Sequence, residues 1–289
     1  MRVRATAPEW LRAHVEAALD EDRAREDLTS ALTISPRDEG EAVLRAGAPG
    51  VLAGTLPAVM AFRQLSPKLY ARALLRDGSR LKRGTAVLRV RGPRARILSG
   101  ERTALNYLMH LSGVATLTAR YLAALRGTGV TLLDTRKTTP LLRALEKMAV
   151  ASGGGRNHRM GLHDAVLIKE NHVRAAGSIM AAVERVRAGL NRRGLARVPI
   201  EIEVQDEHEV REVAPLAVTR VMLDNFSPAR VRAAVRLLRS ARPNVQIEVS
   251  GGINLVTVRR FALPGVDFIS VGALTHSAPA LPLSLDWIK

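Results

Sequence analysis

The sequence predicts an α/β protein in which a small α+β domain precedes a larger parallel α/β domain. Three observations lead to this prediction. Hydrophobic residues make up 47% of the 289 residues but aromatic residues only 3%, so Leu, Val, Ile and Ala must build the core, which suits parallel strands covered by helices. Beyond about residue 110, short β-branched runs alternate with helical stretches, as in βαβ units. The mass of 31.3 kDa also exceeds the usual size of one domain.

The N-terminal part combines a helix with several short strands. Leu11, Val15 and Leu19 recur at helical spacing, and Thr6 with Glu9 forms a capping-box pattern, so a helix is expected there. Strand-like runs follow at residues 41–47, 50–54, 70–75 and 84–92. A turn at Asp77-Gly78 separates the last two of these runs, and the mixture predicts a small α+β domain.

A helical pattern then extends from Pro93 to Leu125. The pair Ser112-Gly113 inside it predicts a break in the helix, and the domain boundary is expected near this break.

The remaining chain reads as a series of parallel strands. The six apolar runs that predict them lie at residues 130–133, 165–168, 200–204, 220–223, 246–249 and 267–271. A complete (β/α)₈ barrel needs eight strands. The sequence alone therefore predicts either an incomplete barrel or two further strands that the pattern does not reveal.

Every one of these six strands is followed by polar residues. The C-terminal ends of parallel strands and their loops usually carry the chemistry of such folds. Ordinary turn chemistry would explain any single polar strand end, but polar residues at all six ends indicate a functional site. Lys169, directly after its strand, is expected deep at the barrel mouth, where it needs a bound anion or a nearby carboxylate as a partner.

The candidate residues form two groups with different chemistry. Arg136, Arg159 and Lys169, with His158, suit a small molecule that bears more than one carboxylate. Glu203 and Asp224, with glycine-rich turns at 250–252 and 271–273, suit Mg²⁺ and phosphate oxygens. Lys137 lies beside Arg136 and could bridge the two groups. Together they indicate group transfer between two anionic substrates by positioning and electrostatics.

Composition excludes several other classes. The net charge is +17 and the pI is near 11.4, but the basic residues are spread along the chain and only nine aromatic residues could stack on bases, so nucleic acid is not an expected partner. The absence of cysteine excludes disulfides and thiolate chemistry. The N-terminus has no apolar signal core and no apolar run approaches a membrane span, so a cytoplasmic protein without membrane association is expected.

Seven motifs, in order over essentially the whole chain, resemble one family. They are "ERTALNYLMHLSGVAT" at 101–116, "DTRKTTP" at 134–140, "GGGRNHRMGLHD" at 153–164, "LIKENH" at 167–172, "EIEV" at 201–204, "LDNF" at 223–226 and "SGGI" at 250–253. With these motifs the chain resembles the quinolinate phosphoribosyltransferases, also called nicotinate-nucleotide pyrophosphorylases (carboxylating). The resemblance implies an N-terminal α/β sandwich domain over residues 1–110 and an incomplete, six- to seven-stranded parallel α/β barrel over residues 111–274. It also implies that the tail, about 275–289, packs back on the first domain.

The resemblance implies the reaction and its residues. Phosphoribosyl pyrophosphate and quinolinate would give nicotinate mononucleotide, pyrophosphate and CO₂, as in de novo NAD biosynthesis, with Mg²⁺ as cofactor. The quinolinate-binding residues would be Arg102, Thr135, Arg136, His158, Arg159 and Lys169. The residues for phosphoribosyl pyrophosphate would be Lys137, Glu203, Asp224, Ser250, Gly251, Gly252, Val271, Gly272, Ala273 and His276. Lys137, Glu203 and Asp224 would be catalytic, and the two acids would hold Mg²⁺ directly or through water.

The resemblance further implies a homodimer, assembled in some members into a hexamer, in which Arg102 reaches into the site of the neighbouring subunit. Two departures from the family pattern are small: Leu141 stands where relatives often have glycine, and Glu170 replaces an aspartate. Two other interpretations stay open. One is a paralogous group associated with molybdenum transport that shares much of this barrel, and the other is a basic polyanion-binding protein without activity.

Overall fold

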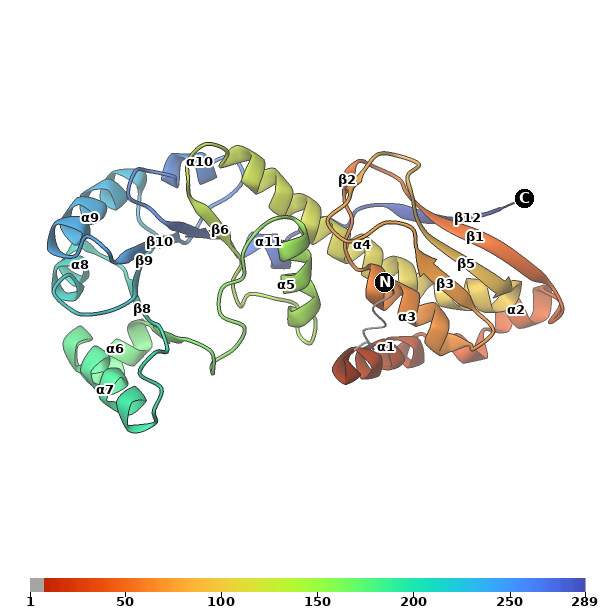
Figure 1. Ribbon diagram of the computed structural model, residues 1–289, viewed down its shortest axis with the longest axis horizontal. Coiled ribbons are helices and arrows are strands. Elements are labelled where there is room, and N and C mark those ends of the chain that lie inside the picture. Colours follow the sequence, from red (N-terminus) through yellow and green to blue (C-terminus); the bar gives the residue numbers. More distant parts are fainter. Residues whose placement is uncertain (1–7, 289) are drawn as a thin grey trace, which may run out of the picture. The chain divides into compact units, whose positions relative to one another are not determined.

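The computed structural model describes residues 8–288, which divide into two compact units (Figure 1). The first unit comprises residues up to 117 together with 151–154 and the residues from 278 onward, and the second comprises 118–150 and 155–277. Within the described part of the chain, no helix is both long enough and apolar enough to cross a membrane.

The first unit is built on a four-stranded antiparallel sheet with the strand order β12-β1-β5-β3. Its strands are β1 (Glu39–Ala46), β3 (Tyr70–Ala73), β5 (Ala86–Pro93) and β12 (Leu283–Trp287). A two-stranded ladder of β2 (Gly50–Val51) and β4 (Arg80–Leu81) accompanies it, and β4 was not expected from the sequence. Strand β12 thus pairs with β1, where Ala42 lies opposite Trp287.

The first three α-helices of the described chain belong to the first unit. They are α1 (Glu9–Glu21), α2 (Leu28–Thr33) and α3 (Thr55–Leu65), with a short 3₁₀ turn at Ala24–Glu26. Helix α3 packs against β3 and β5 of the sheet, and α1 packs against α3. The prediction of the first helix is confirmed, because Leu11, Val15 and Leu19 are its buried residues. Thr6 of the expected capping box lies outside the described residues. The helix begins after Pro8, which makes no side-chain cap.

The predicted break at Ser112-Gly113 is wrong, because helix α4 (Arg94–Ala124) is continuous. Both small residues serve close packing instead. The Ser112 hydroxyl accepts a hydrogen bond from the Ala53 N–H (3.0 Å) and donates one to the Ala53 carbonyl (3.1 Å). A β-carbon on Gly113 would lie only 2.3 Å from the carbonyl oxygen of Pro279. Glycine here admits a neighbouring backbone, and it lies in the helix at a modest cost in helix propensity.

The second unit contains a six-stranded parallel sheet with the order β6-β11-β10-β9-β8-β7. The strands are β6 (Thr131–Leu133), β7 (Val166–Ile168), β8 (Ile200–Val204), β9 (Arg220–Asp224), β10 (Gln246–Ser250) and β11 (Phe268–Ser270). All six predicted strands are confirmed. Within residues 8–288, β6 and β7 are the two edges of the sheet and do not pair. The barrel is therefore incomplete, as predicted. Besides its ladder with β11, β6 has an isolated bridge from Leu133 to Arg156.

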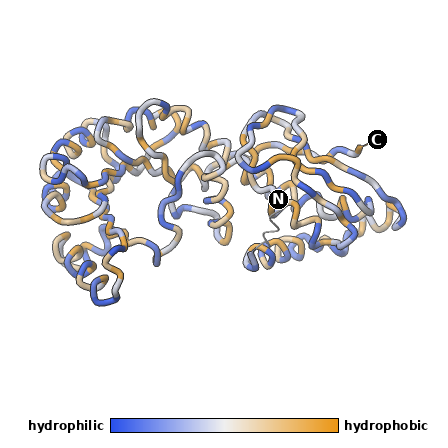
Figure 2. The backbone as a smooth tube through the Cα atoms, viewed as in Figure 1, coloured by the Kyte–Doolittle hydropathy of each residue, from blue (hydrophilic) through white to orange (hydrophobic). Residues whose placement is uncertain are grey.

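Most helices of this unit lie on the outer side of the sheet (Figure 1), whereas α11 (Ala273–His276) lines the cavity described below. The others that follow α4 are α5 (Arg143–Ser152), α6 (Glu170–Ala176), α7 (Ile179–Arg192), α8 (Glu207–Val213), α9 (Pro228–Ala241) and α10 (Val258–Phe261). Hydrophobic and hydrophilic residues alternate along them (Figure 2). In α9, Val231 and Leu238 are buried while Arg232 and Arg236 are exposed, so these arginines form a solvated helix face.

Candidate active site

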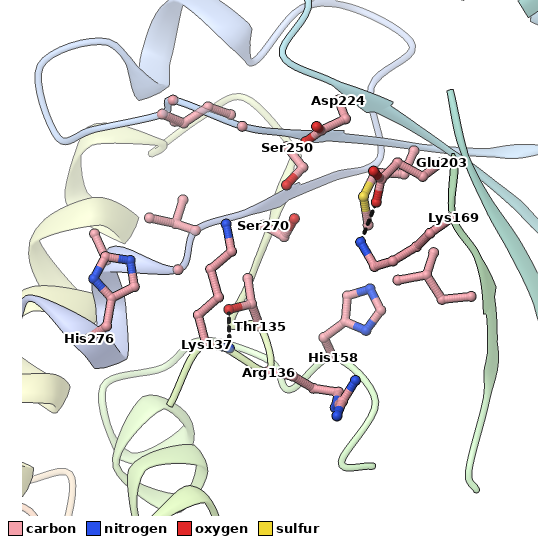
Figure 3. A pocket seen from close by; sticks show the side chains of 18 of the residues that line it. Thr135, Arg136, Lys137, His158, Lys169, Glu203, Asp224, Ser250, Ser270 and His276 are labelled. Carbon is pink, nitrogen blue, oxygen red and sulfur yellow. Dashed lines mark hydrogen bonds and ion pairs between the residues drawn. The ribbon is translucent and has the colours of Figure 1, made fainter. Parts of the chain in front are cut away.

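A cavity of about 640 Å³ opens at the C-terminal ends of the strands of the second unit (Figure 3). Fifteen of the sixteen predicted site residues line it, and Arg102 does not. The predicted residues that line it are Thr135, Arg136, Lys137, His158, Arg159, Lys169, Glu203, Asp224, Ser250, Gly251, Gly252, Val271, Gly272, Ala273 and His276. The strand ends converge on one cavity because all strands of a parallel sheet point the same way.

Two guanidinium groups line the cavity and lie near enough to repel each other. Burial lowers the pKa of Arg159, and the positive charge of Arg136 lowers it further. One hydrogen bond of Arg159 goes to the carbonyl of Ala165, at 3.2 Å. Among the described residues the buried Nε of Arg136 has no hydrogen-bond partner. Two like charges with unused donors need a shared anion, and a carboxylate suits a guanidinium best.

Lys169 forms an ion pair with Glu203 (Figure 3). The expectation that this lysine needs a carboxylate partner is thus confirmed. Its expected deep burial is wrong, because 47% of the side chain is exposed. The reason lies in the sheet: Lys169 follows β7, an edge strand, so no further strand covers it on that side.

Lys137 extends into the cavity from the loop after β6 (Figure 3). Its backbone is held twice, because its N–H donates to Oγ1 of Thr135 (3.0 Å) and its carbonyl accepts from Oγ1 of Thr275 (2.7 Å). A β-carbon on Gly272 would lie 2.9 Å from Cδ of Lys137 and 3.1 Å from Nε2 of His276. Glycine at this position therefore leaves room for the aliphatic part of Lys137.

The turn after β10 packs against the end of β9. Gly251 has φ of +89°, and a β-carbon there would lie 2.3 Å from Oδ1 of Asn225. Asn225 donates its backbone N–H to the carbonyl of Ser250 (2.9 Å) and its side-chain amide to Asp224 (2.7 Å). Only glycine fits this position without strain, and the turn leaves Asp224 held at the cavity wall.

Glu203 and Asp224 are the two carboxylates of the cavity. Burial raises the pKa of Asp224, and the negative charge of Glu203 raises it further, which shows that the two acids repel each other. Such a pair suits a divalent cation that brings phosphate oxygens with it. Lys169 pairs with Glu203, so of the two carboxylates only Asp224 could bind a cation without breaking an ion pair.

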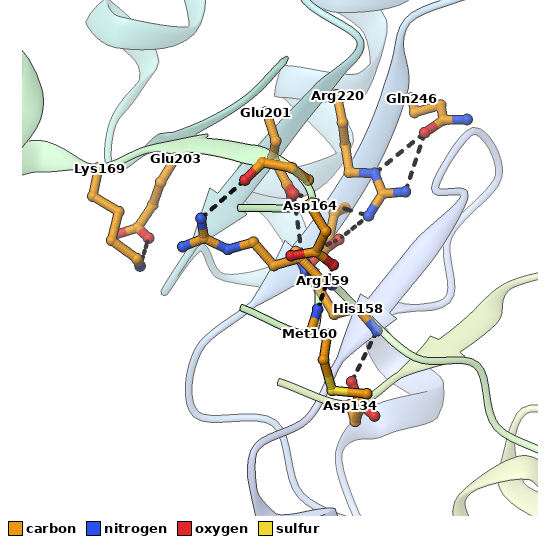
Figure 4. A network of polar contacts seen from close by, with 12 residues as sticks. Asp134, His158, Arg159, Met160, Asp164, Lys169, Glu201, Glu203, Arg220 and Gln246 are labelled. Carbon is orange, nitrogen blue, oxygen red and sulfur yellow. Dashed lines mark hydrogen bonds and ion pairs between the residues drawn. The ribbon is translucent and has the colours of Figure 1, made fainter. Parts of the chain in front are cut away.

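A buried ionic network that the sequence did not reveal lies beside the cavity (Figure 4). His158 Nε2 lies 3.1 Å from Oε2 of Glu201 and 3.5 Å from Oε2 of Glu248. Arg220 lies 2.8 Å from Glu248, and its guanidinium carbon lies 4.0 Å from the centre of the Phe268 ring. The histidine and the two glutamates have metal-like spacing, but Arg220 already supplies the positive charge there. The network fills the sheet interior with ion pairs in place of apolar side chains.

Two features of the network act on the protonation of His158 in opposite directions. Burial disfavours the charged ring, but Glu201 and Glu248 outweigh it and raise the pKa of His158 to about 9. The Arg159 N–H lies 2.7 Å from Nδ1, which favours a ring with its single proton on Nε2. A doubly protonated ring must therefore turn Nδ1 away from that N–H. Burial also raises the pKa of Glu201, whereas His158 helps to lower the pKa of Glu248 against the effect of burial.

The comparisons with known proteins agree with this fold. Two family models match the chain: quinolinate phosphoribosyl transferase, N-terminal domain, over residues 27–112, and C-terminal domain, over residues 114–286. The probable nicotinate-nucleotide pyrophosphorylase [carboxylating] of Synechocystis sp. is 40% identical, over 94% of this chain and 90% of its own length. The protein of the same name in Bacillus subtilis is 39% identical, over 92% and 89%.

Solved structures give the same result. The nicotinate-nucleotide pyrophosphorylase from Francisella tularensis superimposes with a TM-score of 0.89 at 36% identity, over 96% of each chain. The fold and the site together define a class of protein: an α/β chain with an incomplete barrel, whose cavity holds both cationic and anionic side chains. The chain belongs to the quinolinate phosphoribosyltransferase family.

Proposed function

We propose that this protein transfers the phosphoribosyl group of phosphoribosyl pyrophosphate to quinolinate, with loss of CO₂, and so forms nicotinate mononucleotide for NAD biosynthesis. The proposal rests on one observation. The same cavity holds two neighbouring cations, Arg136 and Arg159, and two neighbouring carboxylates, Glu203 and Asp224. The names of the relatives agree with it.

The cationic side of the cavity suits a pyridine dicarboxylate. Arg136 and Arg159 offer planar forks to one carboxylate, and Lys169 offers a third cation. A dicarboxylate with adjacent acid groups needs several cations within a small volume, because each carboxylate loses its water shell on binding. The ligand would also relieve the repulsion between the two arginines.

The other side suits a sugar carrying phosphates. Backbone N–H groups of the turns at 250–252 and 271–273 can bind phosphate oxygens. Glu203 and Asp224 would hold Mg²⁺, and the ion would neutralise charge on the pyrophosphate. Lys137 stands between the two groups, where its ammonium would contact the departing pyrophosphate oxygen.

The reaction needs no enzyme nucleophile. The pyridine nitrogen of quinolinate donates its electron pair to C1 of the ribose, and the bond from C1 to the pyrophosphate oxygen breaks with its electrons on that oxygen. The bond between the ring and the 2-carboxylate then breaks, its electrons pass to the pyridinium ring, and CO₂ leaves. A proton replaces it on the ring. The residues act by orientation and by charge, as the cavity suggests.

We further propose a homodimer in which Arg102 of one subunit completes the site of the other. Arg102 is an exposed residue of α4 in the first unit, and it is absent from the described residues that line the cavity. An exposed arginine within a family motif is explained if a second copy of the chain receives it.

The test is a balance of products. The purified protein with quinolinate, phosphoribosyl pyrophosphate and Mg²⁺ should release CO₂ and pyrophosphate in equal amounts. Arg136→Ala should raise the KM for quinolinate at least about thirtyfold, which corresponds to about 2 kcal/mol for a lost charged hydrogen bond. Arg232→Ala, on the exposed face of α9, is the matched control. No CO₂, with tight DNA binding at about 0.2 M salt, would contradict the proposal and favour a polyanion-binding protein.

A further inference from the structure

A fully buried ion pair joins helix α5 to the end of β6. Lys147 of α5 and Asp134, the residue after β6, are both 0% exposed, and Nζ of Lys147 pairs with Oδ1 of Asp134. The same ammonium donates a hydrogen bond to the carbonyl of His158 at 3.0 Å. Neither residue lines the cavity.

The pair also holds the segment that carries the cavity cations His158 and Arg159. The His158 N–H donates to Oδ1 of Asp134 at 2.8 Å (Figure 4). The amide nitrogen of Asn157, in the orientation that satisfies its surroundings, lies 2.7 Å from Oδ2 of Asp134 and 3.0 Å from the Lys147 carbonyl. Asp134 thus accepts from three donors of two separate segments.

A contribution to the stability of the fold does not explain why this buried ion pair is present. Burial raises the pKa of Asp134 and lowers the pKa of Lys147, so both charged forms are disfavoured by their surroundings despite their attraction. Replacing a buried ion pair by neutral groups of similar volume is often neutral or stabilising, whereas removing one partner is strongly destabilising. The geometry that the pair fixes offers a better explanation.

The ion pair fixes the relative position of the two chain segments that carry the cations of the cavity. Arg136 and Lys137 follow closely after Asp134 along the chain, and Arg159 follows His158. Arg136 and Arg159 repel each other, so their segments would separate unless something held them together. The backbone bridge between Leu133 and Arg156 joins the two segments at the end of β6. Asp134 and Lys147 are the side chains that join them beyond this bridge, next to His158.

We propose that Asp134 and Lys147 are positioning residues, which hold the loop of Arg136 against the segment of His158 and Arg159 so that the cations converge on one dicarboxylate. This inference rests on the proposed function. It adds the requirement that quinolinate affinity depends on two residues that do not touch the ligand.

The test uses the double variant Asp134→Asn/Lys147→Met. The introduced asparagine would keep an acceptor for the His158 N–H, and the introduced methionine would fill the space of the lysine without a charge. We expect thermal unfolding close to that of the wild type, a dissociation constant for quinolinate raised at least about tenfold, and a KM for phosphoribosyl pyrophosphate changed less than about threefold. The matched control is Arg239→Met/Asp267→Asn, an ion pair of 2.7 Å in the same unit outside the cavity.

The results separate the possibilities. A double variant with normal stability and normal quinolinate affinity overturns the inference, and so does an equal loss of affinity for both substrates with a loss of stability. If the double variant does not fold, Asn157→Ala at the exposed edge of the cluster decides, with an expected rise of at least about threefold in the quinolinate dissociation constant. An unchanged constant overturns the inference. Calorimetry of the wild type that detects no quinolinate binding would instead contradict the proposed function.

Discussion

Lys169 and Glu203 form an ion pair inside the cavity, although the sequence motifs assign them to different substrates. Each side chain is therefore held in the ion pair until a ligand takes its place. A dicarboxylate that takes Lys169 would release Glu203 for the ribose or the metal, so the two substrates should bind with positive coupling.

Glu203→Gln tests this coupling. Without the ion pair, Lys169 is free to bind a carboxylate, so quinolinate should bind about two- to fivefold more tightly, the range expected for a pair that is partly exposed. Turnover should fall sharply, because Glu203 is also proposed to act on the other substrate. Titration calorimetry with quinolinate alone measures the first effect. Weaker quinolinate binding in this variant would show that the ion pair does not compete with the ligand.

His158 should titrate far above the usual range for histidine. Glu201 and Glu248 raise its pKa to about 9 against the effect of burial. Because the pKa in the folded state lies above the ordinary value of 6.5, this group's contribution to stability is complete below pH 6.5 and is lost as the pH rises through 9. NMR titration of the ring measures the pKa directly. Glu248→Gln should lower it, and Glu212→Gln, in an exposed pair with His208, should leave it unchanged. Titration near 6.5 would favour the neutral ring held by the Arg159 N–H.

Arg102→Ala should abolish turnover and leave folding intact, because Arg102 is exposed and outside the cavity. Lys137→Ala should also be inactive, because it damages a different part of the site. After the two variants are mixed and allowed to exchange subunits, random assortment should restore about one quarter of the wild-type activity. Activity that stays at zero, with exchange verified by mass labelling, would argue against a site shared between subunits.

Leu141→Gly should stabilise the protein. Leu141 has φ of +64°, a left-handed conformation that disfavours a side chain, and 89% of the residue is exposed, so no buried surface is lost. After the entropy cost of glycine in the unfolded chain, we expect a gain of up to about 1 kcal/mol in the free energy of unfolding. Val256→Gly is the control, since Val256 is equally exposed but has no positive φ, and its stability should fall. Denaturant unfolding of both variants measures the difference.

The strands and their polar ends could be predicted because their signals are local. A β-branched run followed by a charge is visible within about ten residues, and parallel strands bring such ends together without further information. The continuous α4 could not be predicted, because the fit of Gly113 against Pro279 joins positions far apart in the chain. The same holds for the partners of Asp134. Its carboxylate stands out in the sequence, but Lys147 reads as one more lysine of an amphipathic helix.

Two buried residues of the network carry a partial signal in the sequence. Glu201 and Glu248 each lie between two apolar residues inside a strand, and a buried carboxylate in such a place needs a partner. The pattern does not say which partner, because His158 and Arg220 come from other elements.

The pairing of β12 with β1 sets an order for biosynthesis. The first unit leaves the ribosome first, but its sheet lacks an edge strand until Leu283–Trp287 has been made. All six strands of the parallel sheet are translated after β1 and before β12. During that interval the strand β1 has an open edge, which is available for pairing with other nascent chains. The N-terminal part of the first unit is thus synthesised before the parallel sheet, and β12, which completes its antiparallel sheet, is synthesised after it.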